Sequence, residues 1–127
     1  MSNVEIIQQL YLSFKNKDLQ RIDQLCDKDI EWITMNEMPH GGTYVGFKAI
    51  FEDYFPKMLS NFKEFHAIPE TFLDSKNQVV VLGIYDGISK TNKKFQVPFT
   101  HVYEIKENKI IKFRQFTDTQ RIHKSLN

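Results

Sequence analysis

The sequence lacks most of the features that mark specialised classes of protein. It contains one cysteine, Cys26, so it cannot form an internal disulfide. Glu5 interrupts the N-terminal stretch before any apolar run, which argues against a signal peptide, and no apolar segment reaches membrane-spanning length. We therefore expect a cytoplasmic protein that has no membrane as a partner.

The sequence also lacks an excess of charge of either sign. The 17 Lys and Arg residues nearly balance the 16 Asp and Glu residues, for a formal net charge of +1, and no basic run stands out, so we expect no nucleic acid partner. The four histidines are scattered without an HExxH pattern, and the glycines of residues 38–46 form neither GxGxxG nor GK[ST]. We therefore expect no metal and no cofactor.

Aromatic residues, by contrast, are plentiful, with 11 Phe and 5 Tyr among 127 residues. A chain of this length is expected to form one domain, residues 1–127, with a substantial core. An interior rich in aromatic rings suits an apolar cavity, although the same rings also pack well without one.

Apolar spacing predicts helices first and strands later. Helices are expected at residues 4–15, after Asp18 and at residues 47–59. Pro56 falls inside the third helix, so a kink or an early end is expected there. Strands are expected at residues 30–35, 62–73 and 78–88, followed by a long hairpin and a polar tail.

Residues 95–118 are predicted to form this hairpin. From Phe95 to Ile105, every second residue is apolar or aromatic except His101, which is the period-two pattern of a strand with one buried face. His101 should therefore face inward, in the middle of an aromatic row. There it could act as a neutral acid or base, or simply complete a buried hydrogen bond.

A turn at Glu107-Asn108 sets the register of the second strand. If these two residues form the loop, His101 lies opposite Arg114, whose charge would lower the pKa of the imidazole. The residues that would then face inward on the second strand are Lys112, Arg114, Phe116 and Asp118. A three-residue loop would reverse all of these assignments.

A second carboxylate is predicted beside Asp118. If Thr91-Asn92 forms a two-residue turn, Asp86 lies opposite Val97, which also lies opposite Asp118. The two carboxylates would then flank one strand about 10 Å apart and could divide acid and base roles. Alternatively, both are solvated and ionised at strand ends.

An inward face that mixes aromatic and charged groups is typical of a binding pocket with a few convergent polar groups. The predicted catalytic residues are Asp118, His101 and Asp86. The predicted pocket walls are Trp32, Tyr44, Phe99, Tyr103, Arg114 and Phe116. Trp32 suits core packing equally well, and the whole face could instead be a half-buried strand whose polar ends reach water.

The same register turns an apolar patch outward, formed by Val102, Ile111 and Phe113. A contiguous patch of this kind on a sheet predicts a partner, and we expect a homodimer through the outer face. The alternative is that Ile122 and Leu126 of the tail cover the patch in a monomer.

Several segments resemble the SnoaL-like branch of the NTF2-like superfamily, which also includes ketosteroid isomerase, polyketide cyclases and limonene epoxide hydrolase. They are FKNKDLQRIDQLCDKDIEW, GGTYVGFKAIFEDYF, VVVLGIYDG and VPFTHVYEIKENKIIKFRQFTDT. The resemblance implies an NTF2-like, or cystatin-like, α+β cone. In such a cone a curved antiparallel sheet wraps around three helices from the N-terminal half, and a pocket lies at the open end. Many members dimerise through the outer face of the sheet.

The functional residues of that superfamily carry over only in part. Asp118 resembles the acidic residue that closes the final strand in epoxide hydrolase and cyclase relatives, and Asp86 resembles a second acidic residue of the epoxide hydrolase site. Ile84 stands where that site has an arginine, and Thr34 stands where ketosteroid isomerase has its base. The isomerase tyrosine aligns near Leu10 or Tyr11, with Leu10 the favoured match, so neither activity is implied in full.

Two classes of function remain. The first is a small-molecule-binding, cofactor-independent isomerase, cyclase or hydratase that uses acid–base groups in an apolar pocket. The second is a non-catalytic ligand-binding or dimeric interaction module on the same fold, since a fold alone does not fix an activity. Loss of turnover in Asp118→Asn or His101→Ala, with ligand binding retained, would favour the enzyme.

Overall fold

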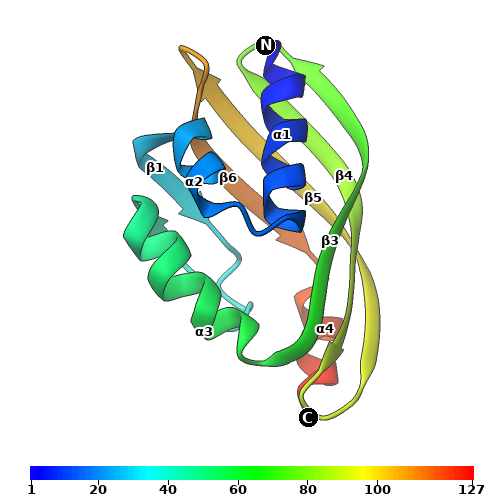
Figure 1. The fold of residues 1–127 in the computed structure, drawn as a ribbon. Coiled ribbons are helices and arrows are strands. Elements are labelled where there is room, and N and C mark those ends of the chain that lie inside the picture. Colours follow the sequence, from blue (N-terminus) through cyan, green and yellow to red (C-terminus); the bar gives the residue numbers. More distant parts are fainter.

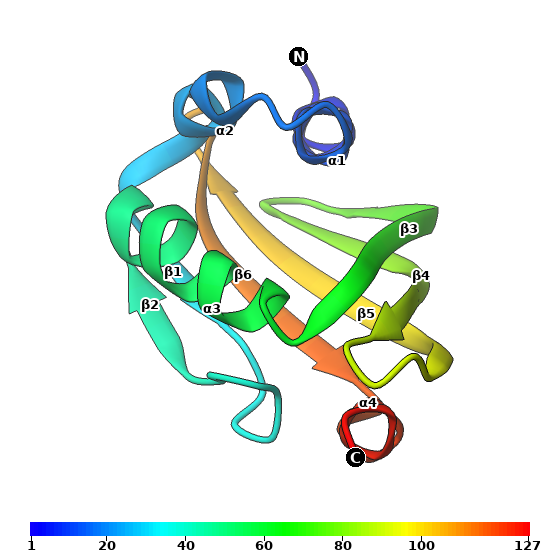
Figure 2. The same cartoon turned by 60° about the horizontal axis from the view of Figure 1, so that its bottom comes forward.

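A computed structural model describes all 127 residues as a curved sheet with helices packed against its concave side (Figure 1 and Figure 2). In chain order the elements are α1 (Asn3–Lys15), α2 (Leu19–Leu25), β1 (Cys26–Ile33), β2 (Thr43–Val45), the π-helix η1 (Lys48–Tyr54), α3 (Phe55–Leu59), β3 (Phe62–Ser75), β4 (Gln78–Ser89), β5 (Lys94–Lys106), β6 (Lys109–Thr117) and α4 (Thr119–Ser125). The predicted α+β architecture is confirmed.

The six strands lie in the order β2-β1-β6-β5-β4-β3. Every neighbouring pair is antiparallel except β1 and β6, which run parallel. The sheet is therefore mixed rather than wholly antiparallel, because the long stretch of chain between β1 and β6 lets the last strand return in the same direction as the first.

The first two helices begin at side-chain caps. The Ser2 hydroxyl accepts a hydrogen bond from the Glu5 backbone N–H at 3.1 Å, and the Glu5 carboxylate accepts one from the Ser2 N–H at 3.0 Å. Asp18 caps α2 by accepting from the Arg21 N–H at 3.1 Å. Both predicted helix starts are confirmed, and they direct the apolar faces of α1 and α2 into the core.

The third helix changes its hydrogen-bond spacing at Pro56. The last bond of η1 runs from the Phe55 N–H to the Ile50 carbonyl, a π-helical spacing. Pro56 has no N–H and cannot continue this ladder, so α3 begins there and runs to Leu59. The predicted break is thus a change of helix type. None of the helices is long and apolar enough to cross a membrane.

The β5–β6 hairpin has the predicted turn but a different register. Glu107-Asn108 forms the turn, with both residues at positive φ, 50° and 63°. Beyond the turn, a bulge at Ile111 inserts one extra residue, and Glu104 pairs with Lys112 instead of Ile111. Because side chains alternate along a strand, this single insertion reverses the facing of every later residue of β6.

This change of register alters which residues of β6 face inward. His101 lies opposite Gln115 rather than Arg114, and the outward-facing Val102 lies opposite Arg114. Arg114 and Phe116 are exposed on the outer face, so the prediction that they line an inner pocket is wrong. Lys112 faces outward as well, since its partner Glu104 does.

The β4–β5 turn corrects the placement of Asp86. Residues 90–92 form a three-residue loop instead of a two-residue turn, which shifts the pairing by one position. Asp86 therefore pairs with Gln96 instead of Val97 and faces outward. The prediction that Asp86 and Asp118 flank one strand on the inner face is wrong.

The core fills the concavity of the sheet. Phe113, predicted on the outer face, is 2% exposed in this core, and its ring stacks on Trp32 with 3.9 Å between ring centroids. Ile122 of α4 is also fully buried. Helix α4 therefore packs at the end of the sheet near the β4–β5 turn, where Figure 1 shows it, and leaves the outer face uncovered.

Candidate functional site

A buried polar group lies where α1 packs against the sheet. His101, which is 4% exposed, projects from β5 into the core. Its Nδ1 lies 2.6 Å from the hydroxyl of Tyr11 on α1, and its Nε2 lies 2.5 Å from the hydroxyl of Tyr85 on β4. Both ring nitrogens of a buried histidine are therefore hydrogen-bonded to phenols.

Two further side chains extend this group. The Tyr103 hydroxyl donates to the Tyr11 hydroxyl at 3.0 Å. On the other side, Gln115 Nε2 donates to the Tyr85 hydroxyl at 2.8 Å, and Gln115 Oε1 accepts from the Met35 backbone N–H at 3.4 Å. We call the five side chains the histidine cluster: Tyr11, Tyr85, His101, Tyr103 and Gln115.

Strand alternation and the bulge bring these groups together. His101 faces inward because of the period-two pattern of β5, and Tyr85 lies in the inward row of β4. Gln115 reaches the position opposite His101 only because Ile111 forms the bulge. The Phe99 ring stacks on the imidazole with 3.9 Å between centroids, which helps to fix the orientation of the ring.

Burial sets the protonation state of the cluster. Desolvation lowers the pKa of His101 to about 3, because the charged imidazolium loses its contact with water. Desolvation also raises the pKa values of Tyr11, Tyr85 and Tyr103. The histidine and the phenols are therefore all neutral at ordinary pH. The predicted cause, an opposing Arg114, is absent, and burial alone lowers the histidine pKa.

The predicted pocket walls separate into three groups. Phe99 and Tyr103 lie beside His101, as predicted. Trp32 is 3% exposed and packs on the rings of the core, which was its alternative assignment. Tyr44 lies at the rim, and Arg114 and Phe116 lie on the outer face.

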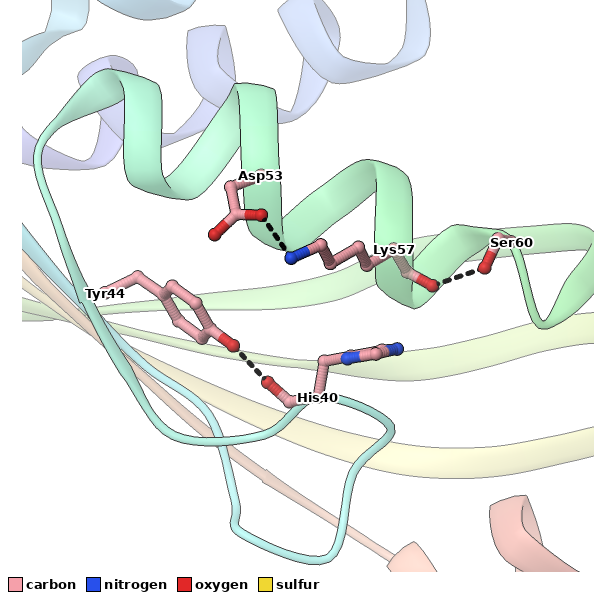
Figure 3. Close-up of polar contacts among 5 residues, drawn as sticks. All are labelled: His40, Tyr44, Asp53, Lys57 and Ser60. Carbon is pink, nitrogen blue, oxygen red and sulfur yellow. Dashed lines mark hydrogen bonds and ion pairs between the residues drawn. The ribbon is translucent and has the colours of Figure 1, made fainter.

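The rim of the cone includes Tyr44 and the loop before β2 (Figure 3). The Tyr44 hydroxyl donates to the His40 carbonyl at 2.6 Å, and its ring packs on Tyr54 with 4.8 Å between centroids. On the facing helix, Lys57 and Asp53 form an exposed ion pair at 2.7 Å. Tyr44 therefore connects the loop to η1 rather than lining the interior.

Asp118 is the N-cap of α4. Its Oδ1 accepts a hydrogen bond from the Arg121 backbone N–H at 3.1 Å, and its φ of −84° and ψ of 84° end the strand conformation of β6. It forms no hydrogen bond with the histidine cluster. The catalytic role predicted for Asp118 therefore stays a prediction.

Two surface hollows lie away from the cluster. One of about 240 Å³ lies beside α4 and is lined by Lys93, Lys94, Phe95, Arg121, Lys124 and Ser125. Another of about 280 Å³ is lined by Glu64, His66, Asp86, Gly87, Ile88 and Lys94. Neither includes a cluster residue. No group of three or more His, Cys, Asp or Glu side chains is placed to hold a metal ion.

Three cluster members are not among the predicted site residues: Tyr11, Tyr85 and Gln115. Tyr11 blends into the apolar stripe of the first helix, and Gln115 is misplaced by the bulge. Tyr85 had a usable signal, because a residue with a polar hydroxyl lies in step with the apolar Val79 and Val81. His101 is likewise a polar residue in the apolar and aromatic inward row of β5. Two such residues on neighbouring strands indicate a buried polar pair.

A curved sheet that encloses helices and a buried polar group defines the NTF2-like, or cystatin-like, class of fold. The family model of the SnoaL-like domain matches residues 7–113, and the chain belongs to this family. The resemblance seen in the sequence segments is thereby confirmed.

Solved structures have the same fold. An NTF2-like protein from Burkholderia thailandensis E264 has a TM-score of 0.94 at 24% identity, covering 100% of this chain and 98% of that one. TerC, co-crystallised with polyporic acid, has a TM-score of 0.89 at 23% identity, covering 98% and 97%. A protein assigned to the SnoaL-like polyketide cyclases, from Jannaschia sp. CCS1, has a TM-score of 0.83 at 15% identity, covering 98% and 90%. None of the curated proteins matches the sequence.

Proposed function

We propose that the protein binds a small, largely apolar molecule inside the cone and moves a proton on it without a cofactor. The histidine cluster is the polar anchor, and the reaction classes that fit are isomerisation, cyclisation and hydration. The observation that carries the proposal is a neutral His101 held between two phenol hydroxyls, at 2.6 Å and 2.5 Å, within an aromatic core.

A neutral imidazole accepts a proton at one nitrogen while it carries a proton on the other. Because burial makes the imidazolium costly, His101 takes up a proton only while the ligand carries a compensating negative charge beside it. The unprotonated ring nitrogen already accepts from a phenol, so that phenol passes its proton to the ring and takes up the ligand's proton in its place. Tyr11 and Tyr85 keep their protons. The three contacts among His101 and the phenols use three of their four hydrogens, so one phenol hydrogen remains to stabilise such a charge in the dry interior. This chemistry needs no carboxylate in the cluster.

Two structural neighbours support a small organic ligand. TerC has the same fold and was crystallised with polyporic acid. The protein from Jannaschia sp. CCS1 is assigned to polyketide cyclases, which supports cyclisation as one of the reaction classes.

Non-catalytic ligand binding is the second candidate. The observation that favours it is the depth of burial, because a base whose pKa is about 3 is weak at neutral pH. No carboxylate hydrogen-bonds to His101 to offset this weakness. In this case the cluster only anchors the ligand.

Proton exchange separates the two candidates. Acetophenone combines an apolar ring with one carbonyl, and its methyl protons exchange with D₂O when a base removes them. We expect the wild type to bind acetophenone in a thermal-shift assay and to speed deuterium incorporation measured by NMR. His101→Gln should lose the exchange and keep the binding, whereas His66→Gln, at an exposed site on β3, should behave like the wild type.

Other outcomes decide against the proposal or part of it. Binding without exchange in the wild type would favour the non-catalytic function. Absence of binding for both acetophenone and polyporic acid would contradict small-molecule binding inside the cone.

A further inference from the structure

The hollow beside α4 carries charge of one sign only. Its lining residues are Lys93, Lys94, Phe95, Arg121, Lys124 and Ser125. Four of these six side chains are cations, and none is a carboxylate. The other hollow is mixed in charge, because Glu64 and Asp86 border it together with Lys94. We call the first one the basic hollow. Its charge is concentrated there by the fold, since the whole chain has a net charge of only +1.

Two segments that are distant in the sequence contribute these cations. The two lysines follow the β4–β5 turn, whereas Arg121 and Lys124 lie about one helical turn apart on α4 and share a face of it. The Thr91 hydroxyl donates to the Ser125 carbonyl at 2.7 Å, and this bond holds the helix against the turn (Figure 2). The basic hollow therefore exists only in the folded chain, which is why no basic run marks it in the sequence.

The protein does not neutralise this charge itself. The ion pairs of the structure join other residues, and no Asp or Glu occurs in residues 87–103 or 119–127. Of the four cationic side chains, only that of Lys93 forms a hydrogen bond, to the Asn127 carbonyl. Asp118, which precedes α4, accepts from the backbone N–H of Arg121 and not from its guanidinium. Three cations of the basic hollow are therefore available to an ion from solution.

Helix position explains one cation of α4 but not the other. Lys124 lies in the last turn, where the helix dipole favours positive charge. Arg121 lies in the first turn, three residues after the cap, where the dipole disfavours it. A guanidinium is a planar fork that binds two phosphate oxygens at once, whereas ammonium groups act as point charges. One fork and three ammonium groups around one hollow match the several oxygens of a phosphate group.

We infer that the basic hollow binds the phosphate or diphosphate group of a small soluble molecule, at a site separate from the histidine cluster. The hollow, at about 240 Å³, is smaller than the pockets of about 300–1,000 Å³ that hold drug-sized ligands. Phe95 is its one apolar lining residue. The site therefore suits a compact, strongly charged group rather than a whole apolar molecule.

A membrane or a nucleic acid fits the basic hollow less well. Helices that lie on a membrane insert apolar side chains into it, whereas Ile122 of α4 is fully buried in the core of the protein. Proteins that bind nucleic acid spread their cations along a stripe or groove to reach many phosphates, whereas the cations here surround one hollow. A small ligand is therefore the partner that the arrangement favours.

Titration with pyrophosphate at low salt tests the inference. We expect saturable binding in calorimetry, weakened by added NaCl, and ¹⁵N NMR shifts that are largest at residues 93–95 and 121–125. Lys94→Gln and Arg121→Gln should each weaken binding about two- to fivefold, the range for one exposed charge pair. Lys106→Gln is the matched control, because Lys106 is an exposed lysine at the opposite end of β5 from Lys94. Thermal unfolding without pyrophosphate should be alike in all four proteins, which shows that the variants fold.

Three results would overturn the inference. The first is no saturable binding of pyrophosphate to the wild type. The second is an equal loss of binding in Lys106→Gln, which would show a general attraction to positive charge rather than a site. The third is binding to vesicles of phosphatidylcholine and phosphatidylserine without saturable binding of pyrophosphate, which would assign the cations to a membrane surface. The acetophenone assay reports on the histidine cluster, so the proposed function can fail while this inference stands, and the reverse.

Discussion

At the scale of single residues, the burial of His101 couples folding to pH. A histidine in an unfolded chain has a pKa near 6.5, whereas burial lowers the pKa of folded His101 to about 3. Below pH 6.5 the unfolded state therefore binds a proton that the folded state does not, and stability falls as the pH falls through this window. Above pH 6.5 both states are neutral, and His101 adds no pH dependence.

Replacing His101 with glutamine should remove this dependence. Between pH 7 and pH 5, the histidine should cost the wild type about 2 kcal/mol of unfolding free energy, at about 1.4 kcal/mol per pKa unit. Urea unfolding at several pH values measures this slope, which should be smaller in His101→Gln whatever its absolute stability. The exposed His66→Gln should keep the wild-type slope. An unchanged slope in His101→Gln would mean that folded His101 is protonated.

The facing of His101 could be predicted, but its partners could not. The facing depends on the local alternation of β5, which the sequence displays. The partners depend on which isoleucine of the pair Ile110 and Ile111 fills the inward place, and either side chain suits it. Nothing local decides between them, so the bulge and the outward position of Arg114 emerge only from the packed sheet.

At the scale of elements, two glycines of β4 leave space for aromatic rings of the neighbouring strand β5. Gly83 and Gly87 pair with Phe99 and Phe95, whose rings lie over them. A Cβ at Gly83 would lie 2.3 Å from the Ile68 carbonyl oxygen and 2.5 Å from the Phe99 ring. Glycine is therefore needed at this position for space, and the ring that occupies the space is the one that stacks on the imidazole.

Gly83→Ala should destabilise the protein by about 1–3 kcal/mol, because the added methyl group overpacks a site that the backbone closes on one side. Urea unfolding measures the loss. Combining it with Phe99→Leu should give less than the sum of the two losses, since the smaller side chain relieves one of the contacts. The outward neighbour Leu82→Ala should cost less than Gly83→Ala. A Gly83→Ala variant as stable as the wild type would show that the Phe99 ring and the Ile68 carbonyl move aside there easily.

Helices α2 and α4 begin at equivalent caps, which gives a test of Asp118. Asp18 and Asp118 each accept from the backbone N–H of an arginine three residues later, at 3.1 Å in both cases. Replacement by alanine should cost about 0.5–2 kcal/mol at either position, whereas asparagine should keep most of the cap. Urea unfolding and the acetophenone exchange assay measure both effects. Loss of exchange in Asp118→Asn but not in Asp18→Asn would support the proton-transfer role predicted for Asp118.

Elements with local signals could be predicted, and elements that depend on distant contacts could not. The caps at Ser2 and Asp18 are visible in the sequence, and both helices begin there. The three-residue strand β2 forms only by pairing with β1, and the π-helical spacing of η1 has no counterpart in the apolar pattern. The loop at residues 90–92 was shortened by one residue in the prediction, and that error alone turned Asp86 to the wrong face.

At the scale of the whole molecule, the convex face of the sheet carries a contiguous apolar patch. Cross-strand pairing places Leu82 in one row with Thr100 and Phe116, and Ile68 in the next row with Ile84 and Pro98. We call the outer patch the set Ile68, Leu82, Ile84, Pro98, Val102 and Phe116. Its members Ile68, Leu82 and Phe116 are 41%, 39% and 49% exposed. Of the residues first predicted for this face, Val102 keeps its place, Ile111 forms the bulge and Phe113 lies in the core.

A homodimer through the outer patch is the last prediction. An apolar face repeated on two chains is self-complementary about a twofold axis, and an interface of ordinary size would bury about 800 Å² per chain. Phe116→Glu and Leu82→Glu should each convert a dimer into monomers in sedimentation at micromolar concentration, because each would bury an unpaired charge. Leu19→Glu is the control, since Leu19 is 50% exposed on α2, away from the sheet face. A monomeric wild type contradicts the dimer, and a dimer that survives Phe116→Glu places the interface elsewhere. Phe113→Glu cannot serve as the test, because it would put a charge into the core and unfold the chain.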